Sequence, residues 1–179
     1  MKTKKQYTDM MTSRKSTPTN PRQMRQALGS FVTGVTIVTT RSSDGTAIGV
    51  TANSFASVSL DPPLILWSLD KQALSRPIFE IAAAFAVNVL SLDQEDLAQR
   101  FSRPSAHKFS GLTTTPGFGD APIIPGSTAT FECRRYALHD GGDHVILIGE
   151  VMAYTHSDRP PLVFHGGQFK SLKPCTERG

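Results

Sequence analysis

The chain has 179 residues, 39% of them hydrophobic and 19% charged, which suits a single globular domain with a sizeable core. No apolar run approaches the roughly 18 residues that a membrane-spanning helix needs, and the N-terminus lacks the apolar stretch of a secretory signal. The net charge of +4 comes from the first 25 residues, where seven basic side chains stand against one aspartate. We therefore expect neither a membrane nor a nucleic-acid partner.

Composition divides the chain into a tail, a domain and a second short tail. We interpret residues 1–20 as a disordered basic extension, 21–171 as one folded domain and 172–179 as a C-terminal tail. Cys133 and Cys175 are not in CxxC spacing, and the five histidines do not have the spacing of metal ligands. We therefore expect no disulfide framework, no metal site and a location in the reducing cytoplasm.

The folded domain begins with a helix and a β-hairpin. A helix is expected at 21–28, with Asn20 as its N-cap and a proline in its first turn. Residues 35–40 are almost all β-branched, an Asp-Gly pair supplies a turn, and residues 47–51 return as the second strand. The double proline that follows Leu60 is expected to break any strand ladder there.

Further strands outnumber the helices between them. We predict strands at 64–69, 85–91, 127–138, 145–153 and 162–164, and helices at 75–83 and 93–101. The stretch 102–125 is rich in Gly, Pro, Ser and Thr, and so long a loop in a compact domain is usually functional. Because strands and helices do not alternate as βαβ units, the pattern favours an antiparallel barrel with added helices.

The most informative segment is TANSFASVSLDPPL at 51–64, which places hydroxyl side chains and an amide at the end of a strand. The glycine-rich motifs of a Rossmann nucleotide site and of a P-loop are absent from the sequence. The segment can hold a polyhydroxylated or phosphate-bearing ligand through its hydroxyls and backbone N–H groups. It can also be a turn that satisfies its own backbone, and composition alone leaves both interpretations open.

A second segment, GGDHVILIGEV at 141–151, starts a strand directly after a glycine-rich turn. The glycines and Asp143 suffice for the turn, so His144 is either incidental or presented to a ligand. The residues alone favour an exposed, incidental histidine.

Together with GVTIVTT, SLDK and FAVNVLS, these two segments resemble the flavin reductase-like family in content, order and spacing. This family comprises small NAD(P)H:flavin oxidoreductases that serve two-component monooxygenases, and the resemblance covers residues 21 to about 171. It implies a mainly β, FMN-binding split β-barrel of Greek-key type, with a few short peripheral helices, that works as a homodimer. It also implies NAD(P)H-dependent reduction of FMN or FAD for a partner flavin-dependent monooxygenase.

The resemblance assigns residues to the flavin site and to the dinucleotide site. Its cofactor-binding positions are Val35, Thr36, Thr51, Ala52, Asn53, Ser54, Ser57, Ser68, Leu69, Asp70, Lys71, Ser75, Ala86, Asn88, His107, Lys108, Phe109, Asp143 and Phe169. Among these, Lys71 is expected to supply the charge for the flavin phosphate, with Ser75 nearby at a helix start. In the family's G-D-H motif the histidine holds the nicotinamide against the flavin, so His144 is the catalytic candidate.

The segment after the last predicted strand departs from the family pattern. Many members carry a basic residue and a tyrosine near the dinucleotide, whereas this chain has His165, Gln168 and Phe169. Phe169 can still stack, but no arginine fork is present to bind the 2′-phosphate of NADPH. We therefore expect NADH rather than NADPH as the hydride donor.

Two other functions are compatible with the same fold. In one, FMN is a fixed prosthetic group that reduces another acceptor, such as a corrinoid or a metal chelate. In the other, the chain is a non-catalytic flavin-binding or heme-binding module, although such a module would not need the G-D-H motif.

Overall fold

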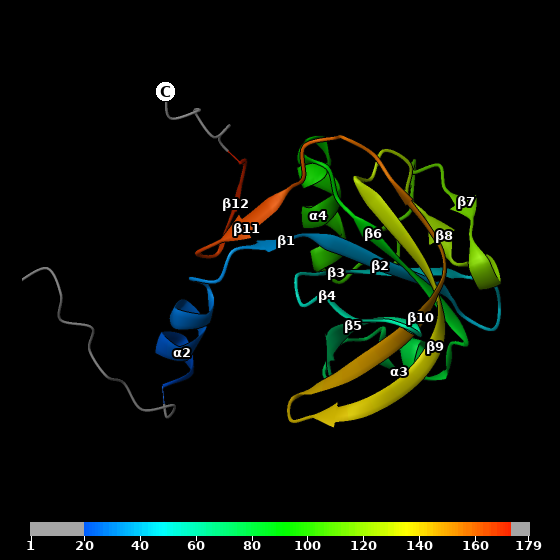
Figure 1. The fold of residues 1–179 in the computed structure, drawn as a ribbon, viewed down its shortest axis with the longest axis horizontal. Coiled ribbons are helices and arrows are strands. Elements are labelled where there is room, and N and C mark those ends of the chain that lie inside the picture. Colours follow the sequence, from blue (N-terminus) through cyan, green and yellow to red (C-terminus); the bar gives the residue numbers. More distant parts are fainter. Residues whose placement is uncertain (1–19, 173–179) are drawn as a thin grey trace, which may run out of the picture.

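The computed structural model describes residues 20–172 and confirms a mainly β fold in which all paired strands are antiparallel (Figure 1). The predicted tails, apart from residues 20 and 172, lie outside the described residues, as does Cys175. The strands are β1 Thr33–Gly34, β2 Thr36–Arg41, β3 Ala47–Ala52, β4 Ala56–Leu60, β5 Pro63–Asp70, β6 Ala84–Val89, β7 Thr115–Pro116, β8 Pro122–Ile123, β9 Ala129–Gly141, β10 His144–His156, β11 Val163–His165 and β12 Gln168–Lys170. The helices are α2 Pro21–Leu28, α3 Arg76–Ile81 and α4 Glu95–Ser102, with 3-10 turns η1 Leu92–Gln94 and η2 Phe118–Asp120.

The largest sheet has seven strands in the order β3-β2-β6-β9-β10-β5-β4. Its two edge strands, β3 and β4, are joined by residues 53–55 alone, so the sheet curls and brings the end of β3 beside β5. Where they meet, Ser54 Oγ donates to the carbonyl of Ser68 at 3.1 Å and accepts from the N–H of Ser68 at 2.9 Å. We call this line of contact between β3 and β5 the seam of the barrel.

Two apolar clusters hold the barrel and its helices together. Inside the barrel, the ring of Trp67 packs edge-on against Phe79 of α3 and Phe85 of β6, with centroid distances of 5.0 and 6.1 Å. A second cluster joins the other face of β2 to α4 and includes Ile37 and Phe101, which are fully buried. Burial of large side chains on both faces of β2 explains why this strand is β-branched almost throughout.

Most predicted elements are confirmed, although their ends differ. The β9–β10 hairpin is longer than predicted, with thirteen residues in each strand. The double proline was predicted to break the strand ladder, and this was wrong for its second proline. Pro63 is the first residue of β5 and pairs with Leu60 of β4. A proline is tolerated as the first residue of a strand, so the interruption is confined to a turn of two residues. Five short strands were not predicted, namely β1, β4, β7, β8 and β12, of which β7 and β8 lie in the stretch 102–125 that was expected to be mostly loop.

Helix α2 begins where the sequence indicates but packs differently from the other helices. Asn20 Oδ1 accepts from the N–H groups of Arg22 and Gln23, at 3.1 and 3.2 Å, and so caps the helix. No residue of α2 is buried, and the helix stands apart from the barrel beside β1, β11 and β12 (Figure 1). Within residues 20–172, no helix has the length and apolar character that crossing a membrane requires.

Candidate active site

A cavity of ≈ 200 Å³ lies at the seam, and we call it the seam cavity. It brings together eight of the residues assigned from the sequence. These are Thr51, Ala52, Asn53, Ser54, Ser68, Leu69, Asp70 and His144. They come from the end of β3, the end of β5 and the start of β10, because β5 pairs with β10 in a register that sets Asp70 opposite His144.

The hydroxyls of the TANSF segment serve mainly the fold. Thr51 Oγ1 donates to the carbonyl of Ala98 in α4 at 2.7 Å, and Ser54 closes the seam. Asn53, in contrast, is exposed at the cavity, and its amide has no hydrogen bond among the described residues. The hydroxyls therefore satisfy nearby backbone, as the interpretation of a turn expects, and a contact between the amide of Asn53 and a ligand stays a prediction.

His144 is held at the seam cavity by a tight turn. Gly142 has φ +79°, and Gly141 pairs directly with His144, so Gly142 and Asp143 form a two-residue hairpin turn. Asp143 Oδ1 lies 2.7 Å from Nδ1 of His144, and the hydrogen bond with His144 lowers the pKa of Asp143. The His144 side chain is 41% exposed, so its Nε2 remains available to a ligand.

Lys71, the residue expected to bind a phosphate, does not line the seam cavity. Its Nζ forms an ion pair with Asp140 at the end of β9, and its backbone N–H donates to the carbonyl of Asp143 at 2.9 Å. Lys71 therefore supports the turn that carries His144, and a contact of its ammonium with a flavin phosphate stays a prediction.

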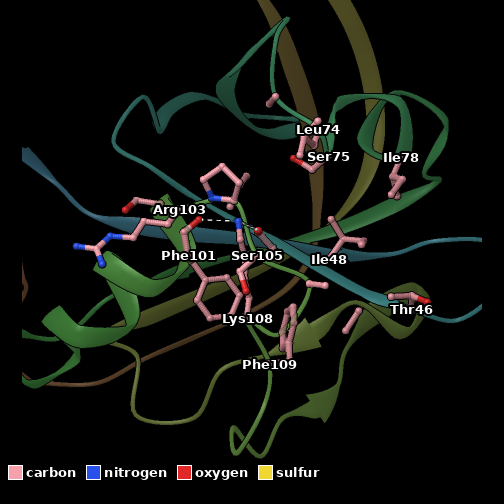
Figure 2. Close-up of a pocket in the computed structure, with 17 residues that line it drawn as sticks. Thr46, Ile48, Leu74, Ser75, Ile78, Phe101, Arg103, Ser105, Lys108 and Phe109 are labelled. Carbon is pink, nitrogen blue, oxygen red and sulfur yellow. Dashed lines mark hydrogen bonds between the residues drawn. The ribbon is translucent and has the colours of Figure 1, made fainter.

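A larger cavity of ≈ 640 Å³ adjoins the seam cavity. It lies between β3, the β5–α3 connection and the loop after α4, and its walls are mostly apolar (Figure 2). Three predicted residues line it, namely Ser75, Lys108 and Phe109. Lys108 extends toward the middle of the lining residues, and burial lowers the pKa of its ammonium (Figure 2). Since Val50 and Ala73 line both cavities, the two form one elongated site.

Four of the assigned residues are enclosed in the core instead. They are Val35, Thr36, Ala86 and Asn88. Thr36 Oγ1 donates to the carbonyl of Ala52 at 2.7 Å and so supports the seam cavity from behind. The amide of Asn88 donates to the carbonyl of Ile37 at 3.1 Å and accepts from the N–H of Ile124 at 2.9 Å. Contacts of Val35, Ala86 and Asn88 with a cofactor stay predictions.

Three further assigned residues lie outside both cavities. Ser57 and His107 are exposed, the latter in the loop after α4. Phe169 of β12 packs edge-on against Phe164 with centroids 5.5 Å apart. Their roles toward a dinucleotide or flavin also stay predictions. Burial raises the pKa of Cys133 to about 12, so this thiol is not a nucleophile.

Sequence reasoning did not find several residues of the larger cavity. Ile48, Ile78 and Arg103 line it, together with the shared residues Val50 and Ala73. Alternation along β3 could have indicated that Ile48 and Val50 share a face, but it could not show that this face opens into a cavity. The β5–α3 connection and the loop after α4 meet there only in the folded chain.

The fold and the elongated site define a split-barrel protein with room for a ligand the size of a flavin. Residues 28–173 match the family described as flavin reductase like domain, and the chain therefore belongs to that family. FMN reductase (NADH) SmoA from Agrobacterium fabrum is 51% identical over 150 residues, which are 84% of this chain and 85% of that protein.

Two further relatives extend the comparison. The reductase component of the flavin-dependent trigonelline monooxygenase of Acinetobacter baylyi is 45% identical over 157 residues, or 87% of this chain. The match covers 51% of that protein, so the chain spans about half the length of this relative. The solved structure of the Streptomyces globisporus NADH:FAD oxidoreductase SgcE6, in complex with NAD and FAD fragments, has a TM-score of 0.86 and 38% identity, and the match covers 90% of this chain and 98% of that one.

Proposed function

We propose that this protein is an NADH-dependent flavin reductase that supplies reduced flavin to a partner flavin-dependent monooxygenase. The observation that carries the proposal is the seam cavity, where the ends of β3 and β5 meet His144. Relatives named as an NADH-dependent FMN reductase and as the reductase component of a monooxygenase support both parts of the proposal.

The residues of the seam cavity fit a flat ring that carries a polyhydroxylated chain. The small side chain of Ala52 lets a ring approach the backbone of β3, and the free amide of Asn53 can exchange hydrogen bonds with it. A bound flavin would supply the hydride-accepting ring. The chain holds that ring and the nicotinamide in contact, in a fixed orientation and shielded from water.

His144 is the residue that we place at the nicotinamide. Its Nδ1 is engaged by Asp143, which orients the imidazole and leaves Nε2 for a hydrogen bond at the mouth of the cavity. Binding of the nicotinamide by His144 requires no nucleophilic side chain in the protein. NADH is the donor that the residues favour, because the segment that carries a basic residue and a tyrosine in many family members has His165, Gln168 and Phe169 here, without an arginine fork for a 2′-phosphate.

The decisive test is the visible spectrum of the purified protein, followed by NADH oxidation in air with and without added FMN or FAD. Rapid oxidation that depends on added flavin is the expected result, because a reductase that serves a separate oxygenase releases its reduced flavin. A colourless protein without turnover under any of these conditions would contradict the proposal and leave a binding module.

The alternative inside the family is a reductase with a fixed FMN and another acceptor. A yellow protein that NADH bleaches anaerobically, and whose turnover is indifferent to added flavin, would favour this alternative. The location proposed for either reaction is the cytoplasm, where NADH is available and where Cys133, a free thiol, stays reduced.

The proposed assembly is a homodimer in which α2 packs on a second copy of the chain. α2 has eight residues, none of them buried, and an isolated helix of this length is only marginally stable in water. Leu28, Phe31 and Val32 are exposed at its end, and we call these three residues the arm surface. Phe31 is 77% exposed, so a covering partner would stabilise both the helix and the apolar surface.

A further inference from the structure

The ion pair between Lys71 and Asp140 lies beside the turn that carries His144. Strand β10 lies between β5 and β9 in the sheet, and His144 is its first residue. Lys71 directly follows the last residue of β5, whereas Asp140 is the next-to-last residue of β9. Their ion pair therefore joins the two strands that flank β10, at the end of the sheet where His144 begins its strand.

Two further interactions connect Lys71 to Asp143 in the turn. The N–H of Lys71 donates to the carbonyl of Asp143 at 2.9 Å. The pKa of Asp143 is lowered first by the hydrogen bond with His144 and least by the positive charge of Lys71. Asp143 in turn holds Nδ1 of His144 at 2.7 Å. The imidazole is therefore linked to Asp140 through Asp143 and Lys71.

Lys71 also belongs to a wall of the seam cavity. After β5 the chain turns, with the N–H of Gln72 donating to Oδ1 of Asp70 at 2.7 Å and the N–H of Ala73 donating to the carbonyl of Asp70 at 3.0 Å. Asp70 and Ala73 both line the seam cavity. Because Lys71 is part of this turn, its contacts with the β9–β10 hairpin hold the cavity wall and His144 at a fixed separation.

We propose that Asp140 and Lys71 are positioning residues for NADH, because their ion pair keeps His144 at the separation from the cavity wall that two stacked rings require. The inference rests on the proposed function, in which the seam cavity holds the flavin ring and His144 holds the nicotinamide. In this role neither residue touches the reacting atoms. Hydride transfer depends on the distance and orientation of the two rings, so a small displacement of the hairpin impairs the use of NADH.

The expected effect is modest because the ion pair is partly exposed. The side chain of Lys71 is 34% exposed and that of Asp140 is 76% exposed. Ion pairs at such positions contribute little to the stability of a fold. Loss of either partner should therefore loosen the turn without unfolding the barrel, and the backbone bond from Lys71 to Asp143 can form in every variant.

The experiment measures the KM for NADH and kcat at saturating FMN, and the dissociation constant of FMN, in wild type and five variants. Asp140→Asn, Lys71→Met and the double variant Lys71→Met/Asp140→Asn remove the ion pair, whereas Lys71→Arg keeps the charge. Glu150→Gln is the matched control, because it removes an ion pair of 2.7 Å with Arg134 on the same β9–β10 hairpin, away from His144.

Asp140→Asn and Lys71→Met should each raise the KM for NADH by about 2-fold to 5-fold, the range that an exposed ion pair can contribute. The double variant should be no worse than either single variant, because all three lack the same interaction. Lys71→Arg and Glu150→Gln should retain the wild-type KM. In Asp140→Asn, kcat and the affinity for FMN should stay within about 2-fold of wild type, since neither depends on the ion pair alone.

An unchanged KM for NADH in Asp140→Asn would overturn the inference. Additive effects in the double variant, or an equal rise of the KM in Glu150→Gln, would also overturn it, because either result indicates a general effect of charge on the hairpin. If Lys71→Met weakened FMN while Asp140→Asn changed nothing, Lys71 would be a flavin ligand and not a positioning residue. Wild-type protein that oxidises no NADH would contradict the proposed function, and this inference with it.

Discussion

His144 shows how one side chain is placed by its immediate neighbours. The turn at Gly142 and Asp143 sets the start of β10, and the carboxylate of Asp143 holds Nδ1 at 2.7 Å. Lys71 supports the same turn through its backbone bond to Asp143 and its ion pair with Asp140. The imidazole is therefore oriented from one side, and its other nitrogen is available at the cavity.

His144→Ala should separate dinucleotide binding from flavin binding. We expect the KM for NADH to rise by about 10-fold, the effect of losing one hydrogen bond, with flavin affinity unchanged. Steady-state kinetics at saturating flavin and flavin titration measure the two quantities. His139→Ala, an exposed histidine on the neighbouring strand, is the matched control. If His144→Ala abolished flavin binding instead, the division of roles would be wrong.

The β2–β3 hairpin shows how a short turn is stabilised by a carboxylate. Asp44 Oδ1 accepts from Ser42 Oγ at 2.5 Å and from the N–H of Thr46 at 3.0 Å. These bonds, first that from Ser42, lower the pKa of Asp44 from 3.8 to about 2. A carboxyl whose pKa is depressed by folding stabilises the fold above its unfolded pKa and loses this contribution as the pH falls through the folded value.

The difference in stability between wild type and Asp44→Asn should therefore depend on pH. It should be constant near neutrality and shrink as the pH falls from about 5 to about 2. Denaturant titrations at a series of pH values measure it. The asparagine keeps an acceptor oxygen but has no charge to titrate. If this difference in stability stayed constant over the whole range, Asp44 would have the same pKa in the folded and unfolded chains.

Strand β10 illustrates how closely a barrel wall is packed. A Cβ added at Gly149 would lie 2.5 Å from Cζ of Phe85 and 2.8 Å from Cβ of Cys133. Gly149 also lies at a register shift between β9 and β10. The glycine therefore gives the Phe85 ring the space that it needs inside the barrel.

Gly149→Ala should lower the free energy of unfolding by about 1–3 kcal/mol, because the ring and the strand have to shift to make room. Gly34→Ala is the matched control, since a Cβ there meets nothing within 4 Å, and it should change stability by no more than about 0.5 kcal/mol. Urea titrations of both variants measure the difference. Equal stabilities of the two variants would show that the wall of the barrel adapts more readily than its packing suggests.

At the scale of the whole molecule, the arm surface is the feature that a single copy leaves unexplained. The helix, β1 and the β11–β12 hairpin extend away from the barrel (Figure 1). They are tied to each other by pairing of β1 with β11 and by the bond from the N–H of Gly166 to the carbonyl of Gly29 at 2.9 Å. A second copy would give this extension the packing surface that its own barrel does not provide.

The variant Leu28→Glu/Phe31→Glu should convert a dimer into a monomer of 19.4 kDa, because two charges would have to be buried in an apolar interface. Size-exclusion chromatography with light scattering measures the mass. Leu60→Glu changes a leucine that is 94% exposed at the β4–β5 turn and should leave the dimer intact. Wild-type protein that is monomeric at all concentrations would refute the assembly.

Local sequence determined much of this protein. β-branched runs predict β2 and the barrel strands, Asn20 predicts a helix start, and the glycines before Asp143 predict the turn that presents His144. These features depend on backbone preferences and on hydrogen bonds between residues close in the chain, so they can be inferred without knowing the fold. The order of the motifs was sufficient to indicate the family.

Only the tertiary structure decided which residues share the site. Lys71 meets Asp140 across 69 positions of sequence, and Lys108 meets the carbonyl of Gly49 across 59. Asn88, assigned to the flavin from sequence, is enclosed between β2 and the segment at Ile124. Such partners are set by strand order and register around the closed barrel, and no local pattern contains that register. Long-range pairing therefore gives Lys71 a carboxylate partner and Lys108 two carbonyl partners.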